Sequence, residues 1–290
     1  MQWLCSGIGE IWPRKSLLQN HDMSAIAIVY TSGSGFVIGA DGRARWSEPD
    51  AVDEAKRRME TEDEQKVFEL TARQAILALG ITGTAYNDDK SFSVVAECQR
   101  AAESLSQTEF TNHLEYVERF CEIVSATIAA AHEKDRFEYL PTTMCAPGHE
   151  NTIVRLLFCG YFWRKPFAYD AEIINRDGTL FCYPTQYPLE RMAPVIIGSE
   201  KIAKLMYEQQ DPRFRNYIVR ITDKSPMQDA ISCVRGYLEA CSTPLARKID
   251  PFCEIVGGHI HIASISPQFG FRWSTRPVSR LDGGVPPLHP

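Results

Sequence analysis

The chain has 290 residues, of which 44% are hydrophobic and 23% are charged, and its formal net charge is −6. A chain of this length and composition can bury the core of one large domain or two small ones. The negative charge argues against non-specific binding to nucleic acid. No apolar run approaches the roughly 20 residues that span a bilayer, so no membrane partner is expected.

Residues 1–22 show no clean hydrophobic period and lack the basic-then-apolar order of a signal peptide, so we interpret them as an N-terminal extension. The nine cysteines are scattered and contain no CxxC, which favours reduced core thiols in a cytoplasmic protein. His259 and His261 share one face of a predicted strand, but no further ligands lie at suitable spacing. We therefore expect no metal and no cofactor.

The first predicted elements are two apolar strands, 25–30 and 36–40, joined by a glycine turn and followed by Asp41. The first strand is apolar almost throughout, which is typical of a strand covered on both faces. The charged segment 47–65 predicts a solvated loop or a short exposed helix. Two further strands are predicted at 66–70 and 75–80.

Two helices follow, at 92–107 and 110–134, and then a proline-containing loop at 135–150. The second half predicts four strands, at 152–163, 167–175, 180–183 and 195–198. Two helices come next, one at 199–209 and one that starts at Ser225-Pro226. Two strands, 258–264 and 269–273, close the fold, and 277–290 predicts a loose C-terminal tail.

Strands and helices that occur in separate groups indicate an α+β protein with antiparallel sheets covered by helical layers. No break in composition divides the chain, so 23–276 is expected to form one domain. The segment 107–150 would be a helical and loop elaboration of that domain.

Several segments together resemble the β-type subunits of proteasomes. The opening strand, its turn and Gly35-Phe36-Val37-Ile38-Gly39-Ala40-Asp41-Gly42-Arg43 are similar to the opening of that family. The strand with Lys66, the strand end 80–85, the turn 197–199 and the Gly257-Gly258 turn into the last strands match in the same order. The similarity covers about residues 23–86 and 152–275.

The resemblance implies a four-layer αββα sandwich, the fold of N-terminal-nucleophile hydrolases, and a peptide or other amide substrate. It also implies a ring-shaped homo-oligomer. The family's carboxylate and lysine map onto Asp41 and Lys66, and a family serine maps onto Ser199, which also suits the N-cap of the next helix. Thr82 and Gly83 would bind an extended substrate by strand addition, with Arg43 beside them.

The nucleophile of this family is the first residue of the mature chain, because its own α-amine, with a pKa of about 7.7–8.0, serves as the base. The matching position falls on Met23 or Ser24, and only Ser24 can attack a carbonyl. Its amine would be free if translation began at Met23, or if 1–23 were a cleaved propeptide. The family propeptide, however, ends in glycine.

Two alternatives remain open at this point. The chain would be a non-catalytic scaffold or binding subunit on the same fold, or a non-proteolytic amidase. The family's second polar pair precedes the Gly257-Gly258 turn, where Val256 takes the serine position. Asp250 lies too far upstream to belong to that pair unless the chain has an insertion there.

Overall fold

The structure is a computed structural model that describes residues 25–47, 58–83, 92–134, 152–189 and 194–278. Its described part is an α+β fold with two antiparallel five-stranded sheets, a two-stranded ribbon and several helices. The expected extension and tail, 1–22 and 277–290, lie almost entirely outside these residues, so the predicted division of the chain stays a prediction.

The first sheet has the strand order β10-β1-β2-β11-β12. Its strands are β1 (Ile26–Thr31), β2 (Gly35–Ala40), β10 (Val195–Ile197), β11 (His261–Ser266) and β12 (Gly270–Thr275). The central hairpin pairs Ile26 with Ala40 and Thr31 with Gly35. The last strands therefore lie beside the first hairpin, although more than two hundred residues separate them in the sequence.

The second sheet has the order β5-β6-β7-β8-β9, in which each strand pairs with the next one along the chain. Its strands are β5 (Val67–Ala72), β6 (Ala75–Gly83), β7 (Thr152–Phe162), β8 (Lys165–Arg176) and β9 (Thr179–Gln186). The ladder between β5 and β6 runs from Val67 opposite Gly80 to Ala72 opposite Ala75.

The two sheets face each other, and a shared apolar core lies between them. Ile26, Ile28 and Ile38 from the first sheet belong to the same buried cluster as Leu157 and Cys159 from the second. Alternate β1 residues, Ala27 and Val29, face the opposite way, into the helices. This explains why β1 is apolar almost throughout, as predicted for a strand covered on both faces.

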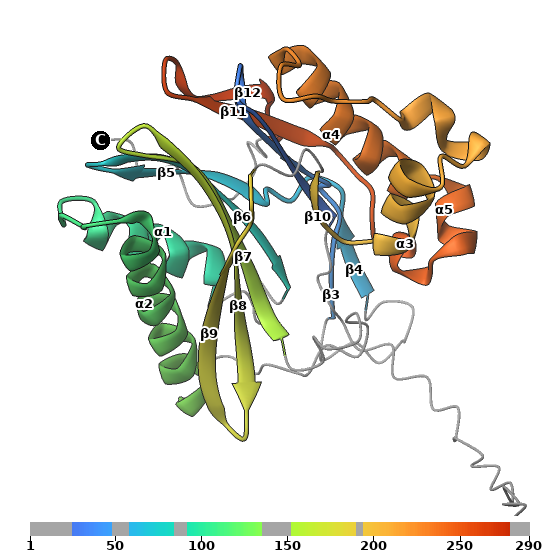
Figure 1. Cartoon of the computed structure of the whole chain (residues 1–290). Coiled ribbons are helices and arrows are strands. Elements are labelled where there is room, and N and C mark those ends of the chain that lie inside the picture. The colour runs from blue at the N-terminus through green and yellow to red at the C-terminus, as the bar shows by residue number, and fades with distance from the viewer. Residues whose placement is uncertain (1–24, 48–57, 84–91, 135–151, 190–193, 279–290) are drawn as a thin grey trace, which may run out of the picture.

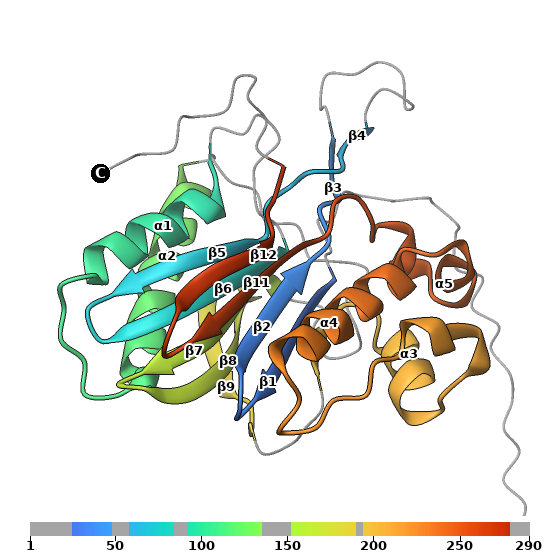
Figure 2. The same cartoon turned by 90° about the horizontal axis from the view of Figure 1, so that it is seen from above.

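Helices cover the outer face of each sheet, as Figures 1 and 2 show. Helices α1 (Val94–Leu105) and α2 (His113–Glu133) share a buried cluster with β5–β9. On the first sheet lie α3 (Glu200–Ala203), η1 (Lys204–Glu208), η2 (Pro212–Tyr217), α4 (Met227–Cys241), α5 (Pro244–Ile249) and η3 (Pro251–Glu254). This arrangement is compatible with the expected sandwich.

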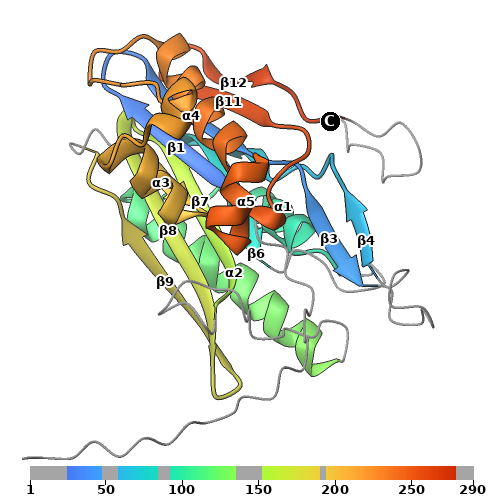
Figure 3. The same ribbon diagram turned by 90° about the vertical axis from the view of Figure 1, so that its right-hand side faces the viewer.

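Some elements differ from the predictions. Parts of 47–65, expected as a loop or short helix, belong to a ribbon formed by β3 (Ala44–Ser47) and β4 (Arg58–Thr61), which projects beyond both sheets (Figure 3). The ribbon escapes prediction because its short strands flank a highly charged stretch. Pro226, and not Ser225, occupies the N-cap position of helix α4. The Ser225 hydroxyl instead accepts a hydrogen bond from the Thr222 amide (2.9 Å).

The described residues bear on the predictions about membrane-spanning segments and about the cysteines. Among them, no helix is both long and apolar enough to cross a membrane. Seven of the nine cysteines lie in the described ranges, and all seven are free thiols, six of them buried. The prediction of core cysteines is confirmed for six of these seven, whereas Cys182 is half-buried.

Candidate functional site

Asp41 is the centre of a buried polar cluster at the point where β1 begins and β2 ends. We call this the open end of the β1–β2 hairpin, and the opposite end, at 32–34, its turn end. The Asp41 side chain is fully buried. Its Oδ1 accepts the Ala25 amide (2.9 Å), and its Oδ2 accepts the amides of Gly257 (3.1 Å) and Arg43 (3.3 Å). The carboxylate thus ties three chain segments together.

Lys66 joins this cluster from the other sheet. It directly precedes β5, and its side chain is only 6% exposed. The Nζ atom lies 3.2 Å from Asp41 Oδ1 and also donates a hydrogen bond to the Arg43 carbonyl. The pair that the sequence predicted, Asp41 with Lys66, is therefore brought together across the gap between the sheets. A buried ion pair of this kind is strongly destabilising to break, because one charge is then left uncompensated.

The surroundings shift the protonation equilibria of the cluster. Complete burial raises the pKa of Asp41, and the Lys66 charge and the Gly257 and Ala25 amides oppose that rise. Burial, together with the nearby Lys66 charge, lowers the pKa of His261 to about 3. His261 is therefore neutral at physiological pH, and its Nε2 accepts a hydrogen bond from the Lys66 amide (3.1 Å).

A second polar pair, formed by the Ser199 hydroxyl and the Asp250 carboxylate, adjoins Gly198, the residue that contacts Ala25. Ser199 is 1% exposed; its hydroxyl donates a hydrogen bond to Asp250 and accepts the Ile202 amide (3.1 Å). The preceding Gly198 contacts Ala25 so closely that a Cβ at Gly198 would lie 3.2 Å from the Ala25 Cα. The predicted N-cap role of Ser199 is confirmed.

Asp250 lies at the site although it is distant from it in the sequence. We expected it to lie too far upstream to belong to the second polar pair unless the chain has an insertion there, and it is hydrogen-bonded to Ser199. The short 3-10 helix η3, Pro251–Glu254, takes up the extra residues before the Gly257-Gly258 turn. Asp250 caps that helix by accepting the Phe252 amide (3.1 Å). The Asp-Pro pair at a helix start was the available signal.

Arg43 lies in the cluster, but its side chain has structural partners. The Arg43 side chain is 13% exposed. Its guanidinium donates hydrogen bonds to the Glu62 carboxylate (2.9 Å) and to the carbonyls of Glu254 (3.3 Å) and Val256 (3.4 Å). It also packs on Gly257, where a Cβ would come within 2.8 Å of it. These contacts fix the turn that donates to Asp41. A direct contact between Arg43 and substrate stays a prediction.

Thr82 and Gly83 end β6 close to Lys66, since the neighbouring Ile81 amide donates to the Lys66 carbonyl (2.9 Å). Strand β7 pairs with both residues on one side, placing Arg155 opposite Thr82 and Val154 opposite Gly83. Strand addition by a substrate would therefore have to use their other side, where the β5 ladder ends at Val67. That role also stays a prediction.

The proposed nucleophile, Ser24, lies outside the described residues, which begin with Ala25. Its role is therefore not tested by the geometry. The two histidines do not act together either: the His259 Nε2 lies 2.7 Å from the Arg276 carbonyl oxygen, whereas His261 contacts Lys66. Within the described ranges, no group of three or more His, Cys, Asp or Glu side chains could hold a metal ion.

The arrangement offers a buried ammonium, a carboxylate that fixes it, and a hydroxyl–carboxylate pair, all near Ala25, the residue that precedes β1. Such groups can stabilise negative charge on a nearby oxygen and hold a nearby amine. Comparison with known proteins adds no identity: no family model matches the chain, and no match to it is found among curated proteins.

Proposed function

We propose that this chain is an N-terminal-nucleophile hydrolase that cleaves peptide or other amide bonds through Ser24, with Asp41 and Lys66 in its site. One observation carries the proposal. The amide of Ala25, the residue directly after Ser24, and the ammonium of Lys66 both hydrogen-bond to Asp41 Oδ1. A chain that starts at Ser24 would therefore present its first residue beside a buried cation.

The chemistry requires a free α-amine on Ser24. The Ser24 hydroxyl oxygen attacks the substrate carbonyl carbon, and its proton passes to the α-amine. Lys66 stabilises the negative charge that develops on the attacking oxygen, and Asp41 holds Lys66 in place. The C–N bond then breaks, the leaving amine takes up the proton, and water hydrolyses the remaining ester.

Two further features support the proposal. The two antiparallel five-stranded sheets between helices have the layer arrangement expected for an αββα N-terminal-nucleophile hydrolase. Gly198, the residue before Ser199, contacts Ala25, and Ser199 is hydrogen-bonded to Asp250. This pair would accept hydrogen bonds from the new α-amine, since Ser199 matches a family serine that lies near the amine of the nucleophile.

The first test is the intact mass of the natively expressed protein, because the mechanism needs a chain that begins at Ser24. A mass that retains residues 1–23 would exclude this mechanism. If Ser24 is terminal, a panel of fluorogenic peptides and simple amides should be hydrolysed, and the panel separates a peptidase from an amidase. The variants Ser24→Ala and Lys66→Arg should each lower kcat at least about 100-fold, as expected when a nucleophile or a charge-stabilising group is lost.

Lys165→Ala is the control, because Lys165 is an exposed lysine at the start of β8 and has no part in the Asp41–Lys66 cluster. Its turnover should equal that of the wild type. Circular dichroism of each variant separates loss of chemistry from loss of folding. Equal turnover in Ser24→Ala and the wild type would end the hydrolase proposal.

One observation favours a second candidate, a non-catalytic scaffold or binding subunit. Three backbone amides and Lys66 already satisfy Asp41, so the cluster has a sufficient structural role without any chemistry. In that case Ser24→Ala would change nothing, whereas Lys66→Met would still destabilise the fold. For both candidates we propose a homo-oligomeric ring, which native mass spectrometry of the purified protein tests directly. A cytoplasmic location stays a prediction.

A further inference from the structure

A cavity of about 790 Å³ opens at the turn end of the β1–β2 hairpin, away from the Asp41–Lys66 cluster. It is lined by Tyr30, Ser32, Pro166, Gln186, Tyr187, Pro188, Leu189 and Asp223. The six residues of β1 separate the two ends by about 20 Å at roughly 3.3 Å per residue. This cavity is therefore distinct from the candidate hydrolase site, and nothing in the proposed reaction uses it.

Among the described residues that line this cavity, Asp223 supplies the only formal charge. Ser32 holds its carboxylate in place with two donors, the backbone amide (3.0 Å) and the side-chain hydroxyl (2.5 Å). These hydrogen bonds, first from the hydroxyl and then from the amide, lower the pKa of Asp223, so the group is ionised at neutral pH. Lys224 adjoins Asp223 in the chain but is exposed and does not line the cavity.

The rest of the lining is neutral and largely apolar. The Tyr30 ring packs on Phe36, with ring centroids 4.6 Å apart, and burial raises the pKa of its hydroxyl. The Tyr187 hydroxyl donates to Asp170 (3.1 Å), which fixes that ring. Tyr30 is thus a neutral aromatic surface near a fixed negative charge, a combination that attracts organic cations.

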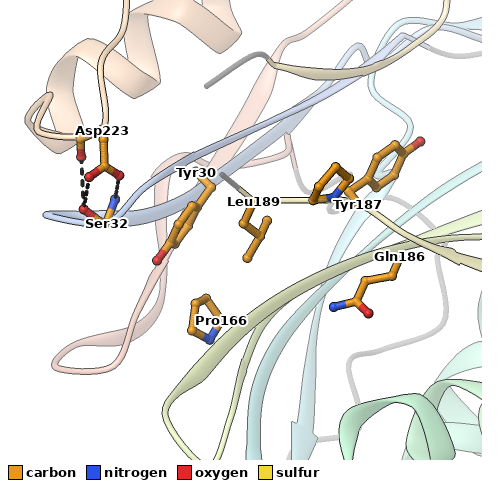
Figure 4. Close-up of a pocket in the computed structure, with 8 residues that line it drawn as sticks. Tyr30, Ser32, Pro166, Gln186, Tyr187, Leu189 and Asp223 are labelled. Carbon is orange, nitrogen blue, oxygen red and sulfur yellow. Dashed lines mark hydrogen bonds between the residues drawn. The ribbon is translucent and has the colours of Figure 1, made fainter. Parts of the chain in front are cut away.

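The lining groups are arranged in order along the cavity. Figure 4 shows Asp223 and Ser32 at one end, Gln186 at the other, and Tyr30, Leu189 and Pro166 between them. The Gln186 carboxamide oxygen accepts a hydrogen bond from the Tyr169 hydroxyl (3.3 Å). The NH₂ group of the same carboxamide can then donate a hydrogen bond to a ligand. A matching ligand has a cationic head, an apolar stem and a hydrogen-bond acceptor.

We propose that this cavity binds a primary ammonium or guanidinium group carried on an apolar stem. A lysine or arginine side chain of a polypeptide has this chemistry, because its stem is aliphatic and its backbone carbonyl follows. A free diamine has the same head and stem but lacks the carbonyl. Anions are disfavoured, since the one charged group among the described lining residues is a carboxylate. The proposal does not depend on hydrolase activity.

The test is an NMR titration of the ¹⁵N-labelled full chain with three probes. N-acetyl-lysine methylamide carries the cationic head, the apolar stem and a backbone carbonyl. N-acetyl-norleucine methylamide has nearly the same shape but no charge. Cadaverine has the amines and the stem but no carbonyl. We expect the lysine probe to bind at least about tenfold more tightly than the norleucine probe, and to shift the amide signals of Ser32, Tyr187 and Leu189.

Asp223→Asn is the informative variant, because an asparagine oxygen still accepts the Ser32 amide while the charge is lost. It should weaken the lysine probe about tenfold. Asp211→Asn is the control: Asp211 is another hydrogen-bonded aspartate, the N-cap of η2, and it is not among the residues that line the cavity. Unperturbed spectra of both variants without probe establish that they are folded.

Three results would each overturn the proposal. The lysine and norleucine probes would bind with equal affinity, the two aspartate variants would have equal effects on binding, or the shifted signals would centre on Asp41 and Lys66. Cadaverine binding as tightly as the lysine probe would support the cation site and assign it to free amines. Weaker cadaverine binding would support the site and assign it to a polypeptide side chain.

Discussion

The two ends of the β1–β2 hairpin treat a carboxylate in opposite ways. At the open end, Asp41 is fully buried and bonded to backbone amides and to Lys66. At the turn end, Asp223 is exposed and held by Ser32 beside an open cavity. A carboxylate that is buried with its partners stabilises the fold, whereas an exposed one beside a cavity is expected to contribute little to stability.

Removing the cation of the open end should have the largest effect on stability. Lys66→Met leaves the Asp41 charge buried without its partner, which should cost about 3–5 kcal/mol of unfolding free energy. Urea denaturation followed by circular dichroism measures the loss. The double variant Asp41→Asn/Lys66→Met should be more stable than Lys66→Met alone, because the uncompensated charge is gone.

Arg73→Met is the exposed control for that prediction. Arg73 and Glu109 form a 2.8 Å ion pair with 60% and 66% exposed side chains. Exposed pairs contribute about 0–1 kcal/mol, so this variant should stay within that range. Similar losses in the Lys66 and Arg73 variants would mean that burial at the open end carries no special weight.

The pH dependence of stability should also originate at the open end. His261 has a pKa of about 3 in the fold, whereas an unfolded histidine titrates near about 6.5. Below pH 6.5 the unfolded chain binds a proton that the native state does not. Stability should therefore fall by about 1.4 kcal/mol per pH unit as the pH drops from 6.5 towards 3.

Urea midpoints at pH 7, 6 and 5 measure this slope. His261→Gln, which keeps an acceptor for the Lys66 amide, should flatten it. Asp223→Asn should leave it unchanged, because the lowered pKa of Asp223 places its titration below this window. Identical slopes in His261→Gln and the wild type would contradict the assignment to His261.

The Ser199–Asp250 pair should have an intermediate effect. Ser199→Ala removes the cap of α3 and the hydrogen bond to Asp250, and should cost about 2 kcal/mol. Thr243→Ala removes the cap of α5, in which Thr243 accepts the Ala246 amide (3.1 Å), and a hydrogen bond to the neutral Ala240 carbonyl (2.8 Å), and should cost about 1 kcal/mol. Thermal or urea unfolding compares the two. An equal cost would show that the contact with Asp250 adds nothing.

Asp223→Asn should have the smallest effect on stability and a selective effect on binding. The side chain is exposed, and its asparagine replacement keeps an acceptor for Ser32. The urea midpoint should match that of the wild type, while affinity for the lysine probe falls. A clear loss of stability would mean that the turn end, like the open end, depends on its carboxylate for folding.

Much of the fold follows from local sequence. Apolar periodicity predicted the β1–β2 hairpin, helices α1 and α2, and the strands β7 and β8, because each of these elements has a face to bury. Strand β9, whose residues are exposed or half-buried, was predicted from its apolar residues and the turn before it. Resemblance to a family supplied the pairing of Asp41 with Lys66, a contact that spans 25 residues. No local pattern predicts such a contact, since the two residues lie on different sheets.

Other features of the site depend on the three-dimensional fold, because the segments that form them have no repeating sequence pattern. The contact between Ser199 and Asp250 depends on a single turn of 3-10 helix, and the neutral state of His261 depends on burial against Lys66, 195 residues away. The cavity at Asp223 forms from four separate segments. Local sequence thus specifies which helices and strands form, because each of them depends on neighbouring residues. The three-dimensional packing decided which polar groups are buried, since burial depends on distant chain segments.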